Sequence, residues 1–389
     1  MNTSKLFMVF LLLPILANKA ASQPSAREVF PEGASPLSTN INKSSYPLLM
    51  PDNSVIFRMR APMADNVQID LSGRTYKMEQ DNGFWSVRTA PQVPGFHYYS
   101  LLIDGFSVAD PASESFFGTS RMSSAIDIPE EEAEFIKVAN VPHGQVSSVW
   151  YYSNLTGTWR EMFVYTPPRY NDNRKKFPVV YIQHGGGEDH RGWVQQGRAG
   201  TILDNLAASK MAVPMILVSA NSNLPAKNGG TGGYSWEGMQ SFREELLESI
   251  IPFIEKNYRV KKGRDNRALC GLSMGGGHSF YIGLRSPETF SKVGVFSTGL
   301  FGGISEASTL DLETEIPGIF SKTEEFNKLF DLFFISCGEQ DPRIEHTLKI
   351  VSHMHENGVN VHFESYPGGH EWQVWRKSFY NFAQNIFKK

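Results

Sequence analysis

The chain has 389 residues, of which 41% are hydrophobic and 20% are charged. This composition is ordinary for a globular protein, and the length is enough for two domains. The formal net charge of −3 at pH 7 provides no basic footprint, so the composition excludes nucleic acid as an expected partner.

Residues 1–22 have the pattern of a removable secretory signal rather than of a folded element. Lys5 supplies the positive end, residues 6–17 form an apolar core, and residues 20–22 (Ala-Ala-Ser) offer a cleavage site before Gln23. The apolar core is too short to span a membrane as a helix. We therefore expect a secreted or periplasmic protein with no membrane attachment after the signal is removed.

Short strands separated by turns predict a small antiparallel β-sandwich in the first part of the chain. Residues 67–71 alternate apolar and polar side chains, as a strand with one buried face does. Residues 82–83 (Asn-Gly) and 104–105 (Asp-Gly) have the composition of tight turns. The acidic segment 127–134 is interpreted as a linker, which gives a module with its linker at residues 23–137. The expected strands are 54–62, 67–71, 76–78, 84–87, 96–103 and 106–108.

A different pattern, in which brief apolar runs alternate with helical stretches, begins at residue 138. Such runs are typical of strands buried on both faces of a parallel sheet. Strands that alternate with helices predict a doubly wound, mostly parallel α/β domain at residues 138–389. The expected strands are 163–165, 179–182, 215–218, 268–270, 293–296, 332–335 and 361–363, and the expected helices are 201–209, 241–257, 276–285, 343–356 and 372–387.

Residues 271–275 (Gly-Leu-Ser-Met-Gly) predict a nucleophile elbow, the strand-to-helix turn of the α/β-hydrolase fold. They follow an apolar run and precede a glycine-rich stretch that continues as a helix, so Ser273 is expected at the apex of the turn. Glycines flank the serine because the turn is strained and the strand and helix pack closely.

A serine hydroxyl becomes nucleophilic when a base takes its proton and an acid orients that base. In folds with this elbow the order along the chain is Ser, then Asp or Glu, then His. Asp341 and His370 follow the last two expected strands, at carboxyl ends where the sites of open α/β sheets form. Asp341 is preferred because it lies in a turn directly before Pro342. Rival acids are Glu339 and Glu345, and rival bases are His346, His353, His355 and His362.

Attack on an ester builds negative charge on the carbonyl oxygen, and two preorganised N–H donors stabilise that charge. We expect one donor to be the backbone amide of Met274, the residue after the nucleophile. The other is expected in residues 184–187 (His-Gly-Gly-Gly), which follow the strand at 179–182. The sequence leaves Gly186 and Gly187 as alternatives for this donor.

The two cysteines, Cys270 and Cys337, are expected as buried free thiols. Both lie in expected strands, and another strand lies between those two in the proposed fold. Strands about 4.8 Å apart would separate the pair by about 9–10 Å, beyond the disulfide Cα limit near about 7 Å. We therefore expect no disulfide between them.

Metal and cofactor sites are not expected in this chain. The histidines do not cluster with carboxylates at metal-ligand spacing. The glycines at 275–277 belong to the elbow and not to a phosphate-binding loop, and no other cofactor fingerprint is present. The chemistry is therefore expected to depend on side chains and backbone amides alone.

Four segments of the second domain resemble the esterase D-like family, namely residues 184–208, 242–260, 267–280 and 358–376. They are most similar to its secreted branch, the feruloyl and acetylxylan esterases of carbohydrate esterase family 1. The resemblance implies hydrolysis of carboxylic esters without a cofactor, with Ser273, Asp341 and His370 matching the family's triad. Residues 338–341 (Gly-Glu-Gln-Asp) depart from the family's looser glycine–acid turn.

The N-terminal sandwich is similar to the Ig-like, glycan-associated modules of the carbohydrate-binding module 48 type that precede such esterases. Its aromatic pairs at 84–85, 98–99 and 116–117 offer rings for stacking on sugars. Because strand alternation buries about half of such rings, packing in the core or between domains is the favoured interpretation.

An exported, cofactor-free esterase joined to a β-module indicates acyl groups on a plant cell-wall polysaccharide as the substrate. Feruloyl esters of arabinoxylan are the first expectation and acetyl esters are the second. Trp193, Trp236 and Trp372 are candidates for the acyl or sugar pocket, with core packing as the alternative. Loops 228–234 and 302–322 are expected beside the site, the second as part of a lid. The alternatives are a siderophore esterase, an acyltransferase and a non-catalytic glycan-binding protein.

Overall fold

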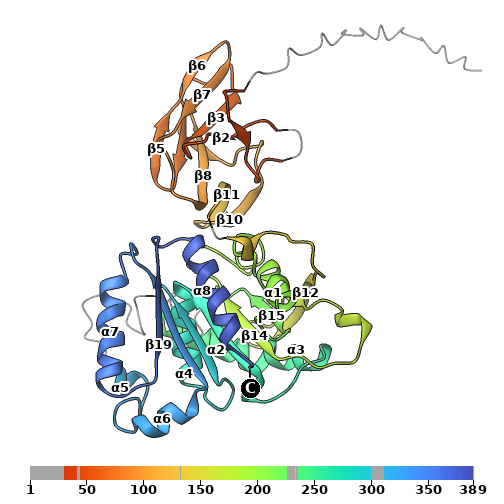
Figure 1. The fold of residues 1–389 in the computed structure, drawn as a ribbon, viewed down its shortest axis with the longest axis vertical. Helices are drawn as coiled ribbons and strands as arrows, with labels where there is room; N and C mark the ends of the chain where they lie inside the picture. The colour runs from red at the N-terminus through yellow and green to blue at the C-terminus, as the bar shows by residue number, and fades with distance from the viewer. Residues whose placement is uncertain are drawn as a thin grey trace, which may run out of the picture.

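The computed structural model describes residues 30–41, 44–131, 133–225, 233, 235–298 and 311–388. Two bodies follow one another along the long axis, a β-sandwich above and a larger α/β domain below (Figure 1). The predicted signal lies outside the described residues. So do nearly all of the glycine-rich loop at 228–234 and the first part, 302–310, of the segment expected in a lid.

The first body is the predicted antiparallel β-sandwich. Its strands alternate as the sequence indicates: in β4, Val67, Ile69 and Leu71 are buried. The turns at Asn82-Gly83 and Asp104-Gly105 have positive φ at both residues, as tight hairpin turns require. One sheet has the order β1-β2-β3-β7-β6 and the other β10-β11-β8-β4-β5, with β9 beside β8. The strands are β1 Ser35–Pro36, β2 Leu48–Leu49, β3 Val55–Arg60, β4 Val67–Leu71, β5 Arg74–Lys77, β6 Glu79–Asp81, β7 Phe84–Arg88, β8 Gly95–Ile103, β9 Phe106–Val108, β10 Ser115–Gly118 and β11 Arg121–Ile128.

The interpretation of 127–134 as a linker was wrong at its beginning. Asp127 and Ile128 are the last residues of β11, where they pair with Phe96 and Gly95 of β8. The chain leaves the sandwich only after Ile128 and then forms a short 3-10 turn at Glu134–Ile136. Asp127 resembled a linker residue because the basic side chain that pairs with it, Arg376, lies 249 residues later in the sequence.

The second body contains the predicted mostly parallel sheet, in the order β12-β13-β15-β14-β16-β17-β18-β19. β12 and β13 are antiparallel to their neighbours, and the other strands are parallel. The edge strand β12 was not predicted, because most of its side chains are exposed and its sequence lacks the short apolar run of a strand buried on both faces. The strands are β12 Gln145–Ser153, β13 Thr158–Thr166, β14 Val179–Gln183, β15 Ile216–Ala220, β16 Arg267–Leu272, β17 Lys292–Phe296, β18 Leu332–Gly338 and β19 His362–Tyr366.

Helices cover both faces of this sheet, as a doubly wound domain requires. Helices α1 and α8 share one hydrophobic core with Val180, Ile182 and Cys270 of the sheet. The continuous helix α2–α3, with a π-turn at Leu246–Ile250, packs on the opposite face with α4 and α7. The helices are α1 Ala199–Ala208, α2 Trp236–Glu245, α3 Ile251–Asn257, α4 Met274–Leu284, α5 Leu312–Glu315, α6 Thr323–Leu329, α7 Ile344–Glu356 and α8 Trp372–Asn385.

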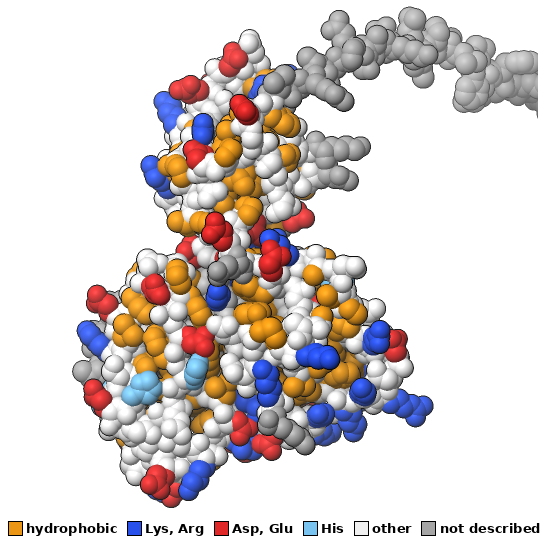
Figure 2. Space-filling view, in the orientation of Figure 1, with side chains coloured by type: hydrophobic (Ala, Val, Ile, Leu, Met, Phe, Trp, Pro, Cys, Tyr) orange, Lys and Arg blue, Asp and Glu red, His pale blue; other side chains and the backbone are white. Residues whose placement is uncertain are grey.

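An ion network joins the two bodies where acidic and basic side chains gather at the waist of the molecule (Figure 2). Arg376 of α8, only 1% exposed, contacts both carboxylate oxygens of Asp127 at 3.2 and 3.3 Å. Arg198 approaches the same carboxylate at 2.8 Å, and Glu130 lies 3.8 Å from Arg376. Because Asp127 belongs to the sandwich, these contacts fix its orientation on the α/β domain.

Cys270 and Cys337 are buried free thiols. Cys270 lies in β16 and Cys337 in β18, and β17 separates these strands as the spacing argument assumed. Burial raises the pKa of both thiols, which keeps them protonated. Across the described ranges, no helix is both long and apolar enough to cross a membrane.

Candidate active site

Ser273 lies at the predicted sharp turn between β16 and α4. Its backbone has φ 51° and ψ −115°, a strained conformation for a residue other than glycine. A Cβ on Gly271 would lie 2.5 Å from the carbonyl oxygen of Gly275, and one on Gly275 would lie 2.5 Å from that of Gln183. The two flanking glycines are therefore required by close backbone contacts between β14, β16 and α4.

A continuous hydrogen-bond chain joins Ser273, His370 and Asp341. The Oγ atom of Ser273 lies 2.9 Å from Nε2 of His370, and Nδ1 of His370 lies 2.7 Å from Oδ2 of Asp341. The two loops that carry Asp341 and His370 follow β18 and β19, which are adjacent in the sheet. Parallel strands thus bring residues from three distant segments to one edge.

Asp341 is held ready to accept a hydrogen bond as a carboxylate. Burial raises its pKa, but the hydrogen bond and charge of His370 and the backbone N–H of Arg343 outweigh burial and hold the pKa below its ordinary value. The other oxygen, Oδ1, accepts the Arg343 N–H at 2.9 Å. A carboxylate fixed on both oxygens orients the imidazole ring.

The rival acids and bases lie elsewhere. Glu339 and Glu345 are exposed, and neither lines the cleft around Ser273. The rival histidines are also outside the cleft: His346, His353 and His355 are on α7, and His362 is in β19.

The loop after β14 is held by the side chain of His184, which is fully buried. Its Nε2 accepts the backbone N–H of Ser222 at 3.0 Å, so the imidazole hydrogen must be on Nδ1. Nδ1 then donates to the carbonyl oxygen of Gly185 at 2.8 Å. Burial lowers the pKa of His184 to about 4, which keeps the ring neutral, as this arrangement requires.

The two glycines proposed as alternatives for the second donor occupy different positions. In a trans peptide the N–H points opposite to the C=O, so the held carbonyl of Gly185 directs the N–H of Gly186 the other way. Gly186 lines the cleft with Ser273, and a Cβ on it would meet nothing within 4 Å. Gly187 does not line the cleft; its carbonyl accepts the N–H of Ser120 in the sandwich. The geometry favours Gly186.

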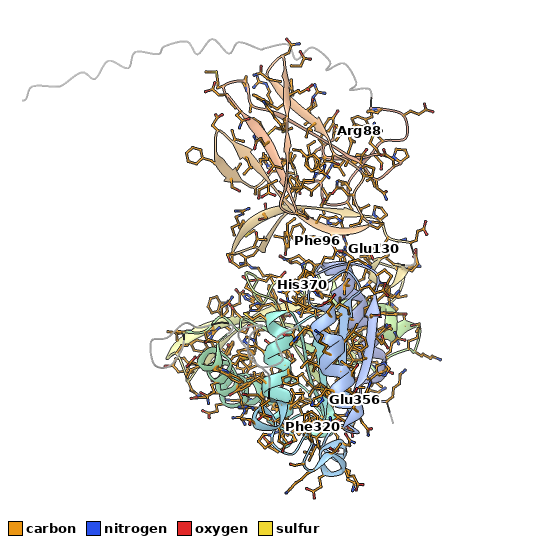
Figure 3. All side chains as sticks on the ribbon, turned by 90° about the vertical axis from the view of Figure 1, so that its left-hand side faces the viewer. Arg88, Phe96, Glu130, Phe320, Glu356 and His370 are labelled. Carbon is orange, nitrogen blue, oxygen red and sulfur yellow. The ribbon has the colours of Figure 1, made fainter. Side chains whose placement is uncertain are left out.

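A cleft of about 280 Å³ opens over Ser273 and His370, and both bodies form its walls. Figure 3 shows Phe96 at the base of the sandwich, facing His370 at the top of the α/β domain. Four of the lining side chains are aromatic, and two of these come from the sandwich. The lining residues are Ser72, Phe96, His97, Tyr98, Thr119, Gly185, Gly186, Glu188, Leu272, Ser273, His370, Glu371, Trp372 and Trp375.

The three candidate tryptophans have three different environments. Trp372 lines the cleft, as the sequence suggested. Trp193 is fully buried, and its ring centroid lies 5.4 Å from that of Trp372. Its Nε1 donates a hydrogen bond to the Gln183 carbonyl at 2.7 Å. Trp236 does not line the cleft; it packs on Tyr281 with centroids 5.0 Å apart. The core alternative therefore describes Trp193 and Trp236.

Sequence reasoning missed much of the cleft lining, including Trp375, Glu188 and Tyr98. Trp375 stacks edge-on against His370 at 4.9 Å, and its position one helical turn after Trp372 was a usable signal. Glu188 directly follows the glycine loop, which was a second signal. Tyr98 was considered only for sugar stacking, and no local pattern indicates that it reaches the cleft.

The other aromatic residues of the sandwich pairs are packed rather than arranged as a sugar platform. Trp85 is buried, with Nε1 donating to the Ala61 carbonyl, and the Tyr99 hydroxyl donates to Asp110 at 2.8 Å. Phe116 is buried. Phe117 lies under the guanidinium of Arg191 from the other domain. These contacts agree with the favoured interpretation of core and interdomain packing.

Among the described residues, no group of three or more His, Cys, Asp or Glu side chains has a geometry that could hold a metal ion.

A sequence-family model, Esterase, matches residues 153–309, a range that includes the elbow and the glycine loop. Over these residues the chain is similar to the esterase family. The predicted resemblance to this group, with an Ig-like module in front, is confirmed, and so is the α/β-hydrolase fold.

Among curated relatives, this chain is 33% identical over 355 residues to the endo-1,4-beta-xylanase/feruloyl esterase of Xylanibacter ruminicola. The match covers 88% of this chain and 46% of that protein. It is 28% identical over 192 residues to endo-1,4-beta-xylanase Y of Acetivibrio thermocellus, covering 46% of this chain and 16% of that one. The chain thus spans less than half the length of these two relatives.

Solved structures are similar as well. A ferulic acid esterase of carbohydrate esterase family 1 from Anaeromyces mucronatus, in complex with ferulic acid, has a TM-score of 0.56 at 27% identity. The match covers 66% of this chain and 96% of that one. The enterobactin esterase FES from Shigella flexneri has a TM-score of 0.64 at 15% identity and covers 85% of this chain and 92% of that one. At that identity the likeness shows a shared fold, and it extends over both bodies.

Proposed function

We propose that this protein is a serine esterase in which Ser273 is the nucleophile, His370 the general base and Asp341 the residue that orients the base. The observation that carries the proposal is the hydrogen-bond chain through these three side chains, at the floor of a cleft beside the glycine loop. The group is recognised by its geometry and roles and not by sequence position alone.

The reaction proceeds through an acyl-enzyme. His370 Nε2 takes the proton of Ser273 as Oγ attacks the ester carbonyl, and the tetrahedral oxyanion forms. Collapse of this intermediate transfers the proton to the leaving alcohol and leaves the acyl group on Oγ. Water then repeats the sequence, giving its proton to His370 and releasing the carboxylic acid with Ser273 restored.

Met274 and Gly186 are the proposed donors to the oxyanion. Met274 is the first residue of α4, where backbone N–H groups have no partner within the helix and the helix dipole favours negative charge. Gly186 lines the cleft opposite, with its N–H directed by the held Gly185 carbonyl. Each such donor contributes about 3–4 kcal/mol to transition-state stabilisation.

The cleft favours an aromatic acyl group, and we propose feruloyl esters as first substrates and acetyl esters as second. Phe96, Tyr98, Trp372 and Trp375 provide flat apolar surface that an acetyl group would leave unused. Two similar proteins, named as a xylanase/feruloyl esterase and a ferulic acid esterase, support the same choice.

We further propose a secreted protein that acts on arabinoxylan or its oligosaccharides. The signal-like residues 1–22 and the xylanase functions in the names of the relatives support this setting. Residues 23–137 and 138–389 are proposed as the boundaries of module with linker and esterase domain.

A siderophore esterase is less well supported. Its substrate would be an anionic iron chelate, which requires basic side chains in the cleft. Among the described lining residues there is no Lys or Arg, and Glu188 and Glu371 are present. A catecholate triester therefore serves as a control substrate.

The deciding experiment compares the products released from feruloylated and acetylated arabinoxylan, with kcat/KM measured for methyl ferulate and p-nitrophenyl acetate. We expect ferulate as the main product. In Ser273→Ala, turnover should fall by at least about a thousandfold while the protein remains folded. Wild-type turnover in that variant would reject the nucleophile, and release of acetate alone would reject the acyl preference.

A further inference from the structure

Tyr98 is a side chain of the sandwich whose hydroxyl is buried inside the esterase domain. It extends from β8, and its oxygen accepts hydrogen bonds from Nε2 of Gln196 at 2.7 Å and from Nε1 of Trp372 at 3.3 Å. Both are N–H donors, and the Gln196 amide is oriented by its second bond to the Phe117 carbonyl at 3.0 Å. The phenol oxygen therefore acts as an acceptor for two groups of the esterase domain.

The hydrogen of the Tyr98 hydroxyl has one acceptor, Glu188. A hydroxyl has two acceptor sites and one donor site, and Gln196 and Trp372 occupy the acceptor sites. Oε1 of Glu188 lies 3.3 Å from the phenol oxygen and takes the donor. Burial raises the pKa of Tyr98, so the phenol retains the proton that it donates.

Glu188 in turn holds the glycine loop. Its Oε2 accepts the backbone N–H of Gly185 at 3.1 Å, and its own N–H points to the Gly185 carbonyl at 3.3 Å. The N–H of Gly185 is thus held by Glu188, and its carbonyl is held by both Glu188 and His184. The N–H of Gly186 belongs to the same peptide as the held carbonyl, so its direction depends on these contacts.

We propose that Tyr98 and Glu188 are a positioning pair through which the sandwich sets the orientation of the oxyanion loop. The proposal rests on the proposed esterase function and deepens it. It assigns the N-terminal body a part in the rate of the reaction itself, beyond forming a wall of the cleft.

The carboxylate form of Glu188 suits this role. Its two oxygens face two donors, the Gly185 N–H and the Tyr98 O–H, and Glu188 is only 5% exposed. Burial raises its pKa to about 7, while hydrogen bonds from Gly185, Tyr98 and Trp372 oppose that rise and nearby Asp189 adds to it. Burying a carboxylate costs free energy that an apolar side chain of similar size would not cost. Its placement between two fixed donors therefore indicates a specific role.

Tyr99 provides a matched control for Tyr98. It is the next residue on β8, it is buried where Tyr98 is partly buried, and its hydroxyl also donates to a carboxylate, Asp110, at 2.8 Å. Its ring packs on Phe57 in the sandwich core, on the opposite side of the strand. Removal of the Tyr99 hydroxyl deletes its bond to Asp110, and removal of the Tyr98 hydroxyl deletes its contacts with Gln196, Trp372 and Glu188. Only Tyr98 is connected to the loop.

The first experiment measures kcat and KM of Tyr98→Phe and Tyr99→Phe with p-nitrophenyl acetate, whose acyl group is too small to need the aromatic wall. In Tyr98→Phe we expect kcat to fall by about 10- to 100-fold with KM changed less than about twofold. A misdirected N–H donor stabilises the oxyanion of the transition state less well, and it leaves binding of the substrate in its ground state unchanged. Tyr99→Phe should keep wild-type kcat.

The second experiment tests the carboxylate by chemical rescue. Glu188→Ala opens a space that is continuous with the cleft, since Glu188 lines it. We expect its kcat to be reduced at least as much as in Tyr98→Phe, and added formate to restore a substantial part of the loss. Formate should have no such effect on Tyr98→Phe, whose carboxylate is present.

The outcomes separate the two proposals. If wild type hydrolyses the ester but Tyr98→Phe keeps full kcat, or if both tyrosine variants lose kcat in proportion to a lowered melting temperature, the positioning pair is refuted. Failure of formate to rescue a folded Glu188→Ala also counts against it. If wild type hydrolyses no ester, the proposed function fails instead.

Discussion

Replacement of Arg376 by alanine should strongly destabilise the folded protein. The guanidinium is 1% exposed and binds Asp127 through two nitrogens, the Gln196 carbonyl at 2.8 Å and, more distantly, Glu130. Removing one partner of a buried ion pair costs about 3–5 kcal/mol, because the remaining charge is left buried. Arg198 still reaches Asp127 in the variant, so we expect the lower end, about 3 kcal/mol.

The assay is urea unfolding followed by tryptophan fluorescence, with the midpoint and slope compared between variants. Arg88→Ala is the matched control, because its ion pair with Asp52 is about half exposed and lies within the sandwich, away from the other body (Figure 3). That variant should unfold like wild type.

A second comparison identifies the cause of the loss. Adding Asp127→Asn to Arg376→Ala removes the buried carboxylate that has lost one of its two cationic partners, so the double variant should be more stable than the sum of the two single changes predicts. A loss below about 1 kcal/mol in Arg376→Ala would refute the view that this network holds the two bodies together.

Two further changes test other parts of the site. Gly275→Ala would place Cβ 2.5 Å from the Gln183 carbonyl, so we expect a loss of at least about 2 kcal/mol, seen as a lowered melting temperature; a wild-type value would contradict the close-contact argument. Glu188 has a pKa of about 7 in the folded protein against 4.5 ordinarily, so its stabilising contribution is present below about pH 4.5 and is lost as the pH rises through about 7. The unfolding free energy of wild type minus that of Glu188→Gln should fall by about 3 kcal/mol between about pH 5 and 8, and a constant difference would disprove the raised pKa.

The edge of the sheet that carries the site was predictable because its signals are local. Ser273 directly follows β16, Asp341 and His370 lie in the turns after β18 and β19, and parallel strands align their carboxyl ends. Side chains that act between the two bodies were not predictable. Tyr98 and Glu188 are 90 residues apart, and neither segment contains a pattern that refers to the other.

The errors have the same origin. Asp127 looked like linker because its partner Arg376 is 249 residues later, although it ends a strand. Trp236 was a candidate for the cleft, but it packs against Tyr281 in the second half of α4. Periodicity reports which face of an element is buried, and it does not report which distant element buries it.

The division of the cleft between two bodies has a consequence for how this protein can change over generations. Ser72, Phe96 and Thr119 shape the opening, yet no reacting atom comes from their part of the chain. Substitutions there can tune which acyl group is admitted without disturbing the bond-breaking machinery. Apart from Tyr98, the first body can therefore diversify in what it admits while the second body conserves how the bond is cleaved.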